Sequence, residues 1–439
     1  MHTNKTTILW LNRRLASQQH QRPTRVRYWV VVFAVTLAVI TYIDRVCIGV
    51  AAPAIQEDLH LSKVQMGYIF AAFGWAYALF EIPGGFLGDW MGARRVLLRI
   101  VLWWSIFTAA TGRAWNFASL AVTRFMFGVG EAGCFPNLTK TFTTWLPHHE
   151  RVRAQGIMWL SARWGGAFTP PLVYFVIKLM SWRHAFEVFG CIGIVWAVFF
   201  YRWYRDHPRD NRNLNDAERR LLEPNEALAA GHSHVPWRKF VASAQVWLLC
   251  GQYFCSSYGW YFYITWLPTY LKEARGLKPH AIAMLGILPL FMGGLGSLVS
   301  GLIAAPLTRR TGSVLKARRL LAYVGFSGAS AMLVVSTRMH DPLPAMIAMG
   351  LASFSNDLVM PGSWGACMDV GGKHAGTLSG AMNMMGNIGG AVSPTVVGYM
   401  LRWTDNNWNA PLYISATTYA VAVLLWRFLD PVTPLEVQS

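Results

Sequence analysis

The stretch TYIDR at residues 41–45 decides the fold, because it places an acid, Asp44, and a guanidinium, Arg45, in the middle of an apolar run at 28–53. An apolar run of this length can cross a lipid bilayer, so both charges would lie at membrane depth. A charged side chain there costs roughly 2.5–3.5 kcal/mol on insertion scales and normally faces a cavity or a partner. The alternative is a structural ion pair that only holds helices together. We favour a substrate or proton site, because further charges of this kind recur downstream.

The composition is that of a membrane protein. Hydrophobic residues make up 54% of the chain and charged residues only 14%, whereas ordinary globular domains carry about 25% charged residues. The apolar residues fall into runs of about 20, the length that spans a hydrocarbon core. Strands of a membrane β-barrel would be about half as long and would alternate in polarity. The sequence therefore predicts an all-α integral membrane protein.

Apolar runs bounded by Gly, Pro or charge predict twelve transmembrane helices. They lie at 28–52, 66–88, 95–112, 117–144, 153–179, 184–204, 244–271, 281–306, 318–337, 342–368, 375–401 and 409–430. A long polar segment divides them into two halves of six. The expected organisation is a cytoplasmic tail at 1–27, a six-helix bundle at 28–204, a cytoplasmic linker at 205–243 with a helix at 215–230, a second six-helix bundle at 244–430 and a tail at 431–439.

The basic charge of the chain indicates its orientation in the membrane. The formal net charge is +18, but a nucleic-acid binder gathers its Lys and Arg on one soluble face, and here these residues lie in the turns. With a cytoplasmic amino terminus, the inside segments carry roughly three times as many Lys and Arg residues as the outside segments, in line with the positive-inside rule. We expect a multi-pass protein of the inner cell membrane with both termini in the cytoplasm.

The sequence carries no motif of an enzyme, a metal site or a bound cofactor. All six cysteines fall inside predicted spans, so neither a disulfide framework nor a metal site is expected. There is no nucleotide-binding Gly-x-x-x-x-Gly-Lys-Ser/Thr loop and no His-Glu-x-x-His zinc helix. The sequence also offers no set of residues that would form an activated nucleophile. A proton is the expected coupling ion, and sodium is left open.

A loop rich in Gly and Arg follows the second span and recurs after the eighth. The first copy is GFLGDWMGARR at 85–95, and the second, at 301–312, is degraded, with Ala305 where the first has an acid. The recurrence six spans later predicts an internal repeat. We expect the acid and the arginines of the first copy to close the cytoplasmic side. The candidate gate residues are Gly85, Asp89, Gly92, Arg94 and Arg95.

The fourth span adds a second pair of charges. Arg124 and Glu131 are seven residues apart and therefore lie on one helical face. With Asp44 and Arg45, they make two acids and two guanidiniums available to a central cavity. A guanidinium binds a carboxylate by paired hydrogen bonds, and a desolvated acid can take up a proton near physiological pH. The four residues therefore suit a site shared by an anion and a proton. The alternative is that Arg124 and Glu131 form a static clamp.

Other polar side chains within the spans are candidates for substrate contact. Arg163 in the fifth span either supplies a second cation to the cavity or snorkels to the membrane interface. Asn383 and Asn387 are four residues apart in the eleventh span, and a polyhydroxylated ligand would supply the partners that these amides need. The candidate substrate-binding residues are Tyr42, Arg45, Tyr77, Arg163, Asn383 and Asn387.

These features together resemble the major facilitator superfamily. Two sets of six spans and the 85–95 loop carry that resemblance, while TYIDR at 41–45 and RFMFGVGEAGCFP at 124–136 resemble its anion:cation symporter family. The resemblance implies proton-coupled uptake of organic anions such as aldonates, hexuronates, aldarates, tartrate or phthalate. It implies substrate contact by Tyr42, Arg45, Tyr77 and Asn387, and proton coupling by Asp44 and Glu131, with Arg124 beside them.

Two features depart from the pattern of that family. Sugar-acid members tend to carry an uncharged polar residue near the position of Arg163, so its charge favours a diacid or a more highly charged sugar acid. The dipeptide Asn356-Asp357 in the tenth span has no interpretation from the sequence. The choice between a mono- and a dicarboxylate stays open.

Three hypotheses for the function follow. The leading one is a monomeric proton-coupled symporter that binds a small organic carboxylate between its halves and exposes it alternately to either side. An exchanger of organic phosphate for inorganic phosphate would need basic residues in both halves of its cavity, and the seventh span, 244–271, contains no Arg or Lys. A membrane receptor without transport is disfavoured by the short tails. The expected partners are a small organic anion and the lipid bilayer, not nucleic acid.

Overall fold

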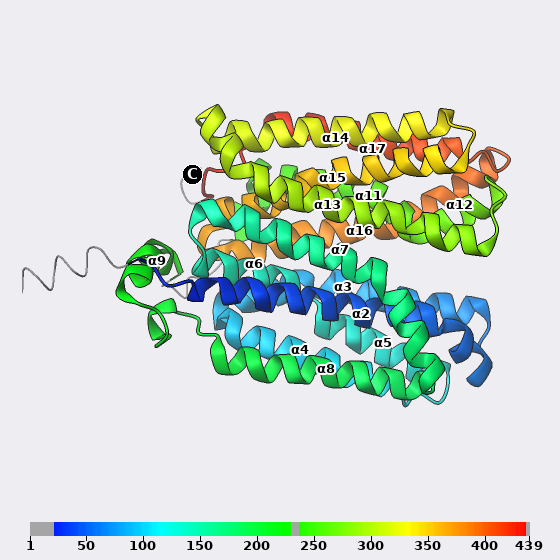
Figure 1. Ribbon diagram of the computed structural model, residues 1–439, viewed down its shortest axis with the longest axis horizontal. Helices are drawn as coiled ribbons and strands as arrows, with labels where there is room; N and C mark the ends of the chain where they lie inside the picture. Colours follow the sequence, from blue (N-terminus) through cyan, green and yellow to red (C-terminus); the bar gives the residue numbers. More distant parts are fainter. Residues whose placement is uncertain (1–21, 230–236, 436–439) are drawn as a thin grey trace, which may run out of the picture.

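The computed structural model describes residues 22–229 and 237–435, which form helices and turns without strands. Figure 1 shows two groups of helices lying side by side. The first half contains α2 (Trp29–Asp58), α3 (Lys63–Met91), α4 (Ala93–Thr111), α5 (Phe117–Glu131), α6 (Cys134–Trp145), α7 (His148–Leu179) and α8 (Trp182–Trp203). The second half contains α11 (Ala244–Thr265), α12 (Leu267–Glu273), α13 (Pro279–Thr311), α14 (Val314–Arg338), α15 (Pro342–Gly371), α16 (Ala375–Trp403) and α17 (Asn409–Phe428).

The segment between the halves contains two short helices, α9 (Asp216–Ala229) and α10 (Trp237–Ala242). The helix predicted at 215–230 corresponds to α9, and residue 230 lies outside the described residues. Figure 1 places α9 at one end of the molecule, which we call the α9 end. The chain before α2 is tied to this helix, because the backbone N–H and the guanidinium of Arg27 both donate to the carboxylate of Glu218.

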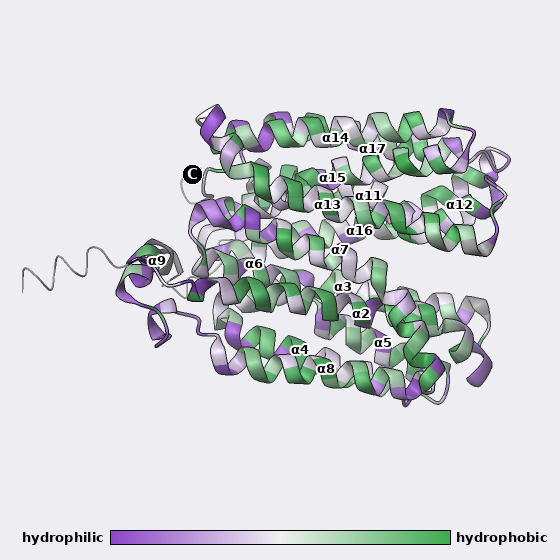
Figure 2. Cartoon of the chain, viewed as in Figure 1, coloured by the Kyte–Doolittle hydropathy of each residue, from purple (hydrophilic) through white to green (hydrophobic). Residues whose placement is uncertain are grey.

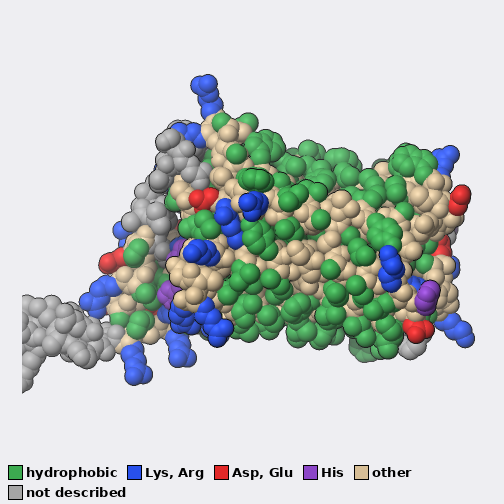
Figure 3. Space-filling view, turned by 90° about the horizontal axis from the view of Figure 1, so that it is seen from above, with side chains coloured by type: hydrophobic (Ala, Val, Ile, Leu, Met, Phe, Trp, Pro, Cys, Tyr) green, Lys and Arg blue, Asp and Glu red, His purple; other side chains and the backbone are tan. Residues whose placement is uncertain are grey.

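The surface is that of a multi-pass membrane protein. Hydrophobic residues dominate the middle of the helices (Figure 2), and Figure 3 shows a band of hydrophobic side chains between two ends that carry charges. Each expected span coincides with one helix or with two helices joined by a break. Among the described residues, six stretches are long and apolar enough to cross a membrane: Val26–Asp58, Gln65–Met91, Trp182–Trp203, Met284–Thr311, Val314–Arg338 and Pro342–Trp403. The count of twelve crossings stays a prediction.

The fourth expected span, 117–144, is two helices rather than one. α5 ends at Glu131 and α6 begins at Cys134, with Gly133 between them at a φ of 81°. Glycine adopts this left-handed conformation without steric cost, and a Cβ at Gly133 would lie 2.6 Å from the Cα of Gly84. The N–H of Gly133 donates to the carboxylate of Glu81 in α3. Glu131 therefore stands at the last position of α5, where the chain turns.

Local sequence signals explain several other helix ends. Ser62 and Asn116 each begin a helix with a capping box, in which side chain and backbone exchange hydrogen bonds across the first turn. The seventh expected span is broken after Thr265, and Pro268 stands in the first turn of α12, where its missing N–H costs nothing. Gly92 follows the last residue of α3 and has a φ of 86°, and a side chain there would collide with the carboxylate of Asp206.

The two halves meet along two seams. α7 packs against α13 and α15, and α16 packs against α3 and α6. Glycines allow the backbones to approach directly: a Cβ on Gly156 of α7 would lie 3.0 Å from the Cα of Gly301 of α13, and a Cβ on Gly85 of α3 would collide with the backbone of Gly376 of α16. Small residues are what close helix packing in membranes requires. This close approach lets central side chains of both halves reach one cavity.

Candidate functional site

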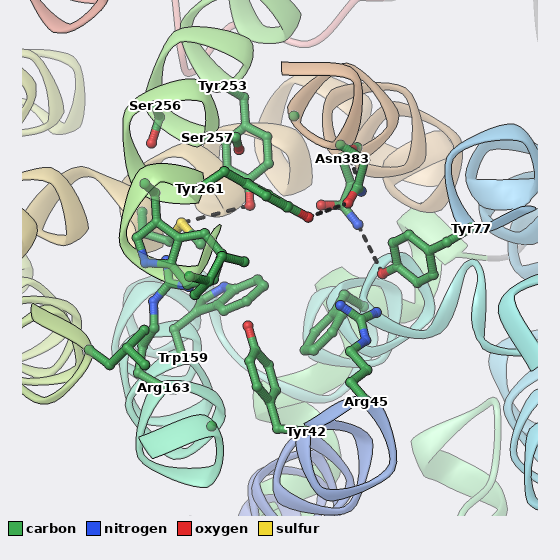
Figure 4. A pocket seen from close by; sticks show the side chains of 18 of the residues that line it. Tyr42, Arg45, Tyr77, Trp159, Arg163, Tyr253, Ser256, Ser257, Tyr261 and Asn383 are labelled. Carbon is green, nitrogen blue, oxygen red and sulfur yellow. Dashed lines mark hydrogen bonds between the residues drawn. The ribbon is translucent and has the colours of Figure 1, made fainter. Parts of the chain in front are cut away.

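A cavity of about 290 Å³ lies between the halves. Its wall comes from α2, α3, α6 and α7 on one side and from α11, α13, α15 and α16 on the other. Figure 4 shows Arg45 and Arg163 on opposite sides of the cavity, with Tyr42 between them. All the residues predicted to bind substrate line it, namely Tyr42, Arg45, Tyr77, Arg163, Asn383 and Asn387. The structure therefore gathers them, while their roles stay predictions.

Arg45 reaches the cavity from α2 and is held by an acid behind it. Its Nε lies 2.7 Å from Oε1 of Glu131, whose side chain is fully buried, while the Arg45 side chain is 19% exposed. The guanidinium also lies 4.3 Å from the centre of the Tyr77 ring, within the range of a cation–π contact. Within the described part of the chain, Nη2 of Arg45 has no hydrogen-bond partner. That nitrogen is buried, and the exposed part of the guanidinium lines the cavity, where it can contact an anionic group.

Asp44 and Arg124 lie behind the wall and do not line the cavity. Asp44 is 1% exposed and Arg124 2% exposed, and they are close enough to interact electrostatically. Neither carboxylate oxygen of Asp44 has a hydrogen-bond partner among the described residues. The guanidinium of Arg124 lies 4.2 Å from the centre of the Phe127 ring.

This arrangement corrects the sequence-based picture in two respects. Of the two acids and two guanidiniums expected in the cavity, only Arg45 lines it, and Asp44, Arg124 and Glu131 are buried beside it. The static clamp between Arg124 and Glu131 is not formed either, because Glu131 pairs with Arg45 instead. Residues on one face of a helix need not contact one another when a neighbouring helix supplies a better partner.

Glu81 is a site residue that the sequence analysis missed. It is fully buried in α3, and its carboxylate accepts hydrogen bonds from the N–H of Gly133 and from the side-chain amide of Asn383 in α16. The same amide donates to the hydroxyl of Tyr77 at 3.3 Å, as Figure 4 shows. Glu81 therefore connects the break between α5 and α6 to the second half. The available signal was an acid inside the apolar span 66–88.

Arg163 is neither a free second cation nor an interfacial arginine. It is 3% exposed, and its Nε and Nη2 lie 2.7 Å and 3.1 Å from Oδ2 and Oδ1 of Asp357 in α15. The snorkelling alternative is therefore wrong. Both departures from the family pattern meet here, because Arg163 and the Asp357 of the Asn356-Asp357 dipeptide form one bidentate ion pair between the halves. Sequence reasoning did not connect them because 194 residues separate them.

The second half faces the cavity with neutral polar groups. The hydroxyl of Tyr261 donates to Oδ1 of Asn387 at 3.2 Å, and the hydroxyl of Ser256 donates to Oδ1 of Asn356 at 2.8 Å. Among the described residues that line the cavity, those of the second half include no Lys or Arg. Both arginines of the cavity wall thus come from the first half, while the second half contributes hydroxyl and amide groups, a distribution that suits an anion carrying hydroxyl groups.

Asp89 of the predicted gate joins the halves at the α9 end. Its Oδ1 lies 3.0 Å from Nζ of Lys140 and accepts from the N–H of Gly376 at 3.1 Å. Its Oδ2 accepts from the N–H and the hydroxyl of Thr377 at 2.6 Å and 2.7 Å. A carboxylate at the first turn of a helix is favoured by the unpaired N–H groups there. Asp89 therefore connects α3 to the start of α16.

The arginines of the predicted gate do not take part in this contact. Arg94 donates from Nη2 to the carbonyl of Tyr201 at 2.6 Å, and its N–H donates to Oδ1 of Asp206 at 2.9 Å, both within the first half. Burial raises the pKa of Asp206, and the hydrogen bond from Arg94 opposes that rise. Arg95 is exposed. The expected closure by Asp89 with Arg94 and Arg95 is thus corrected: Asp89 contacts the second half, and Arg94 braces its own half.

A second contact at the α9 end was not expected from the sequence. Asp369 of α15 accepts from Nη2 of Arg318 at 2.5 Å, lies 2.9 Å from Nε2 of His148 and lies 3.5 Å from Nη1 of Arg151. His148 and Arg151 belong to α7 in the first half, whereas Asp369 and Arg318 belong to the second. Two acids, Asp89 and Asp369, therefore join the halves at the same end.

Comparisons with known proteins agree with this architecture. The model of the Major Facilitator Superfamily matches residues 34–394. The "Probable sulfoacetate transporter SauU" of Cupriavidus necator is 36% identical over 401 residues, covering 90% of this chain and 92% of that protein. The D-galactonate transporter of Escherichia coli is 31% identical, covering 87% and 90%. The chloroplastic sodium-dependent phosphate transport protein 1 of Arabidopsis thaliana is 27% identical, covering 92% and 79%.

Solved structures share the fold. The proton:xylose symporter XylE superposes with a TM-score of 0.74 at 13% identity, covering 94% of this chain and 98% of that one. The fucose transporter FucP in its outward conformation gives a TM-score of 0.70 at 15% identity, covering 92% and 99%. The family model and the relatives are those of transporters, not enzymes. The chain therefore belongs to the Major Facilitator Superfamily and is a membrane transporter.

Proposed function

We propose that this protein is a secondary active transporter that moves a small organic carboxylate together with a proton. The observation that carries the proposal is the pair of Arg45 and Glu131. A partly exposed guanidinium faces a central cavity and shares only one of its nitrogens with a buried acid. The relatives named for sulfoacetate and D-galactonate support an organic anion as the substrate.

Arg45 binds the carboxylate in this proposal, and neutral groups bind the rest of the substrate. The partly exposed guanidinium of Arg45 and its neighbour Tyr77 form the anion-binding side of the cavity. Tyr261, Asn383 and Asn387 of the opposite side offer hydroxyl and amide groups, which suit the hydroxyl groups of an aldonate, a hexuronate or an aldarate. A charge-assisted hydrogen bond contributes about 1.5–3 kcal/mol, so the arginine dominates the affinity.

Glu131 carries the driving proton in this proposal. When Glu131 is ionised it neutralises the charge of Arg45, so a substrate carboxylate would add an unpaired negative charge; when Glu131 is protonated, the positive charge of Arg45 is available to the substrate. A carboxylate and a proton therefore enter the site together, and the buried charge stays balanced. Asp44 and Arg124 lie within electrostatic range of Glu131 and set the field in which the proton binds.

Alternate exposure of the cavity requires the contacts at the α9 end to open. Asp89 and Asp369 join the halves there, and the seams of α7 and α16 are where the halves would rock against each other. We assign the α9 end to the cytoplasm of a cell whose inner membrane holds the protein, because the positive-inside rule requires the Lys- and Arg-rich segments on that side.

A proteoliposome experiment tests the proposal. The purified chain is reconstituted with an acidic exterior, and uptake of radiolabelled D-galactonate is measured. Glu131→Gln should abolish accumulation driven by the pH gradient while leaving exchange of labelled for unlabelled substrate in place. Glu187→Gln is the matched control, since Glu187 pairs with the exposed Arg113 on the surface. Undiminished accumulation by the Glu131→Gln variant would contradict the proposal.

An exchanger of organic phosphate for inorganic phosphate is the second candidate. The relative from Arabidopsis named as a phosphate transport protein favours it. Against it, the second-half wall of the cavity contributes no Lys or Arg among the described residues. Inorganic phosphate that drives counter-transport without any effect of a pH gradient would favour this candidate over the symporter.

A further inference from the structure

Asp357 is a buried acid beside the cavity to which the proposed function gives no role. Asp357 of α15 forms a bidentate ion pair with Arg163 of α7, and the two side chains are 0% and 3% exposed. α7 belongs to the first half and α15 to the second, so the pair crosses the interface on which alternate exposure depends. Arg163 lines the same cavity as Arg45, on the opposite side (Figure 4).

Arg163 and Asp357 bind each other through two guanidinium nitrogens and both carboxylate oxygens. Both oxygens of Asp357 are bound to Arg163, and Oδ1 also accepts from the side-chain amide of Asn356 at 3.0 Å. The guanidinium lies 3.9 Å from the centre of the Trp260 ring. Arg163 is therefore an anion-binding group of the kind found at Arg45, but a carboxylate of the chain itself already occupies it.

The groups that surround Asp357 leave Arg163 as its charged partner within the described part of the chain. The titratable groups that interact with Asp357 electrostatically are Arg163 of α7, Tyr253 and Tyr263 of α11, and Tyr419 of α17. α13 presents neutral residues there, Gly293 and Ser297. A proton added to Asp357 would thus remove the negative charge that neutralises Arg163.

We infer that Asp357 is a second proton-binding acid that controls a second anion subsite at Arg163. In its ionised form, Asp357 fills this subsite; when Asp357 is protonated, the second acidic group of a dianionic substrate takes its place on Arg163. The one bond formed is the O–H bond between a proton taken from the aqueous solution and a carboxylate oxygen of Asp357, and the substrate anion then replaces that carboxylate on Arg163. The inference rests on the proposed function and adds to it that a dianion binds with one more proton than a monoanion.

Charge balance is the physical reason for this coupling. The pair of Arg163 and Asp357 has no net charge, and a protonated Asp357 with a substrate anion on Arg163 has none either. A substrate anion added without the proton would leave an unpaired negative charge in a buried site, where it is strongly disfavoured. The alternative is that the pair is only a clamp between the halves, in which case its removal affects monoanions and dianions alike.

Galactarate and D-galactonate form a matched pair of probes, since they share a carbon skeleton and differ in having two carboxylates or one. Their affinities for the purified full-length chain are measured by calorimetry at pH 6, 7 and 8. In the wild type, both affinities are compared at each pH. Because galactarate binds with one additional proton, the ratio of galactarate to galactonate affinity should rise about tenfold for each pH unit of acidification. In Asp357→Asn, this difference between the two probes disappears. A persistent wild-type difference in that variant overturns the inference.

A double variant protects the test against misfolding, because Asp357→Asn leaves a buried arginine unpaired. In Arg163→Gln/Asp357→Asn neither charge remains. We expect its galactarate affinity to fall at least tenfold relative to galactonate at pH 6, with equal pH dependence for both probes. If the double variant keeps the wild-type ratio of galactarate to galactonate affinity and the wild-type pH dependence, the pair is only a clamp between the halves. Glu187→Gln, on the surface, should behave as the wild type.

The outcomes separate this inference from the proposed function. If the wild type binds neither probe at any of these pH values, both fail. If Glu131→Gln loses gradient-driven D-galactonate accumulation but the Asp357 variants keep the wild-type difference between probes, the symporter stands and only the second subsite is overturned.

Discussion

Two ion pairs flank the central cavity, and they are built differently. Arg45 and Glu131 both come from the first half, meet through one nitrogen and one oxygen at 2.7 Å, and leave the arginine side chain 19% exposed. Arg163 and Asp357 come from different halves, meet through two nitrogens and two oxygens, and are almost completely buried.

The difference indicates what each arginine can do. A guanidinium has five N–H donors in a fixed fork, so a single contact with Glu131 leaves donors of Arg45 for a substrate. Nε and Nη2 of Arg163 both donate to Asp357. Arg163 can therefore bind another anion only when that carboxylate is neutralised. In our proposal, the open pair therefore binds any carboxylate, and the closed pair distinguishes between carboxylates.

The largest expected effect comes from breaking the open pair. Arg45→Gln should lower D-galactonate uptake at least about 100-fold, because it removes the donor to the substrate and leaves Glu131 buried without its partner, which costs about 3–5 kcal/mol. Arg45→Lys keeps the charge but loses the fork and should retain a small residual activity. Uptake by proteoliposomes measures both, and uptake by Arg45→Gln within threefold of the wild type would contradict the role of Arg45.

Breaking the closed pair should act on stability. Arg163→Gln leaves Asp357 as an unpaired acid at 0% exposure, and the expected loss in free energy of unfolding is about 3–5 kcal/mol. Arg163→Gln/Asp357→Asn should recover most of that loss, since no buried charge remains. Unfolding of the purified variants in detergent measures the difference. A double variant as unstable as the single one would mean that the pair does not dominate the stability at this position.

The smallest effect is expected at the α9 end, where Asp89 joins the two halves without forming part of either ion pair at the cavity. Asp89→Asn weakens charge-assisted hydrogen bonds to the first turn of α16, each contributing about 1.5–3 kcal/mol, and should increase the population open at this end. Spin labels at Arg202 and Lys316, exposed residues of the two halves, would report a longer distance.

Asp206→Asn is the matched control for Asp89→Asn. Asp206 accepts from the N–H of Arg94 within the first half, so this substitution should leave the distance between the labels unchanged. Equal effects of the two substitutions would mean that Asp89 does not hold the halves together.

Much of the fold could be predicted from the sequence, because spans are a local property. Apolar length and polar turns identify the segments that became helices. Charges inside those segments drew attention to Arg45, which lines the cavity, and to Glu131, which pairs with it. The paired amides Asn383 and Asn387 were found by the same reasoning, and both line the cavity.

The remaining features depend on which helices become neighbours, and local patterns do not contain that information. Asp357 could not be interpreted because its partner Arg163 lies in the other half. Two of the four groups that bind Asp89 are backbone N–H groups of α16, which no side-chain motif reveals. The break at Gly133 depends on close contact with Gly84 of another helix.

Proton movement during substrate entry tests the central claim most directly. Proteoliposomes containing the wild-type chain and a pH-sensitive dye in the lumen receive external D-galactonate without an imposed pH gradient, and luminal pH is followed together with labelled uptake. The account predicts that the lumen acidifies in step with D-galactonate entry and that Glu131→Gln abolishes this acidification. Entry of D-galactonate with no change in luminal pH would contradict it.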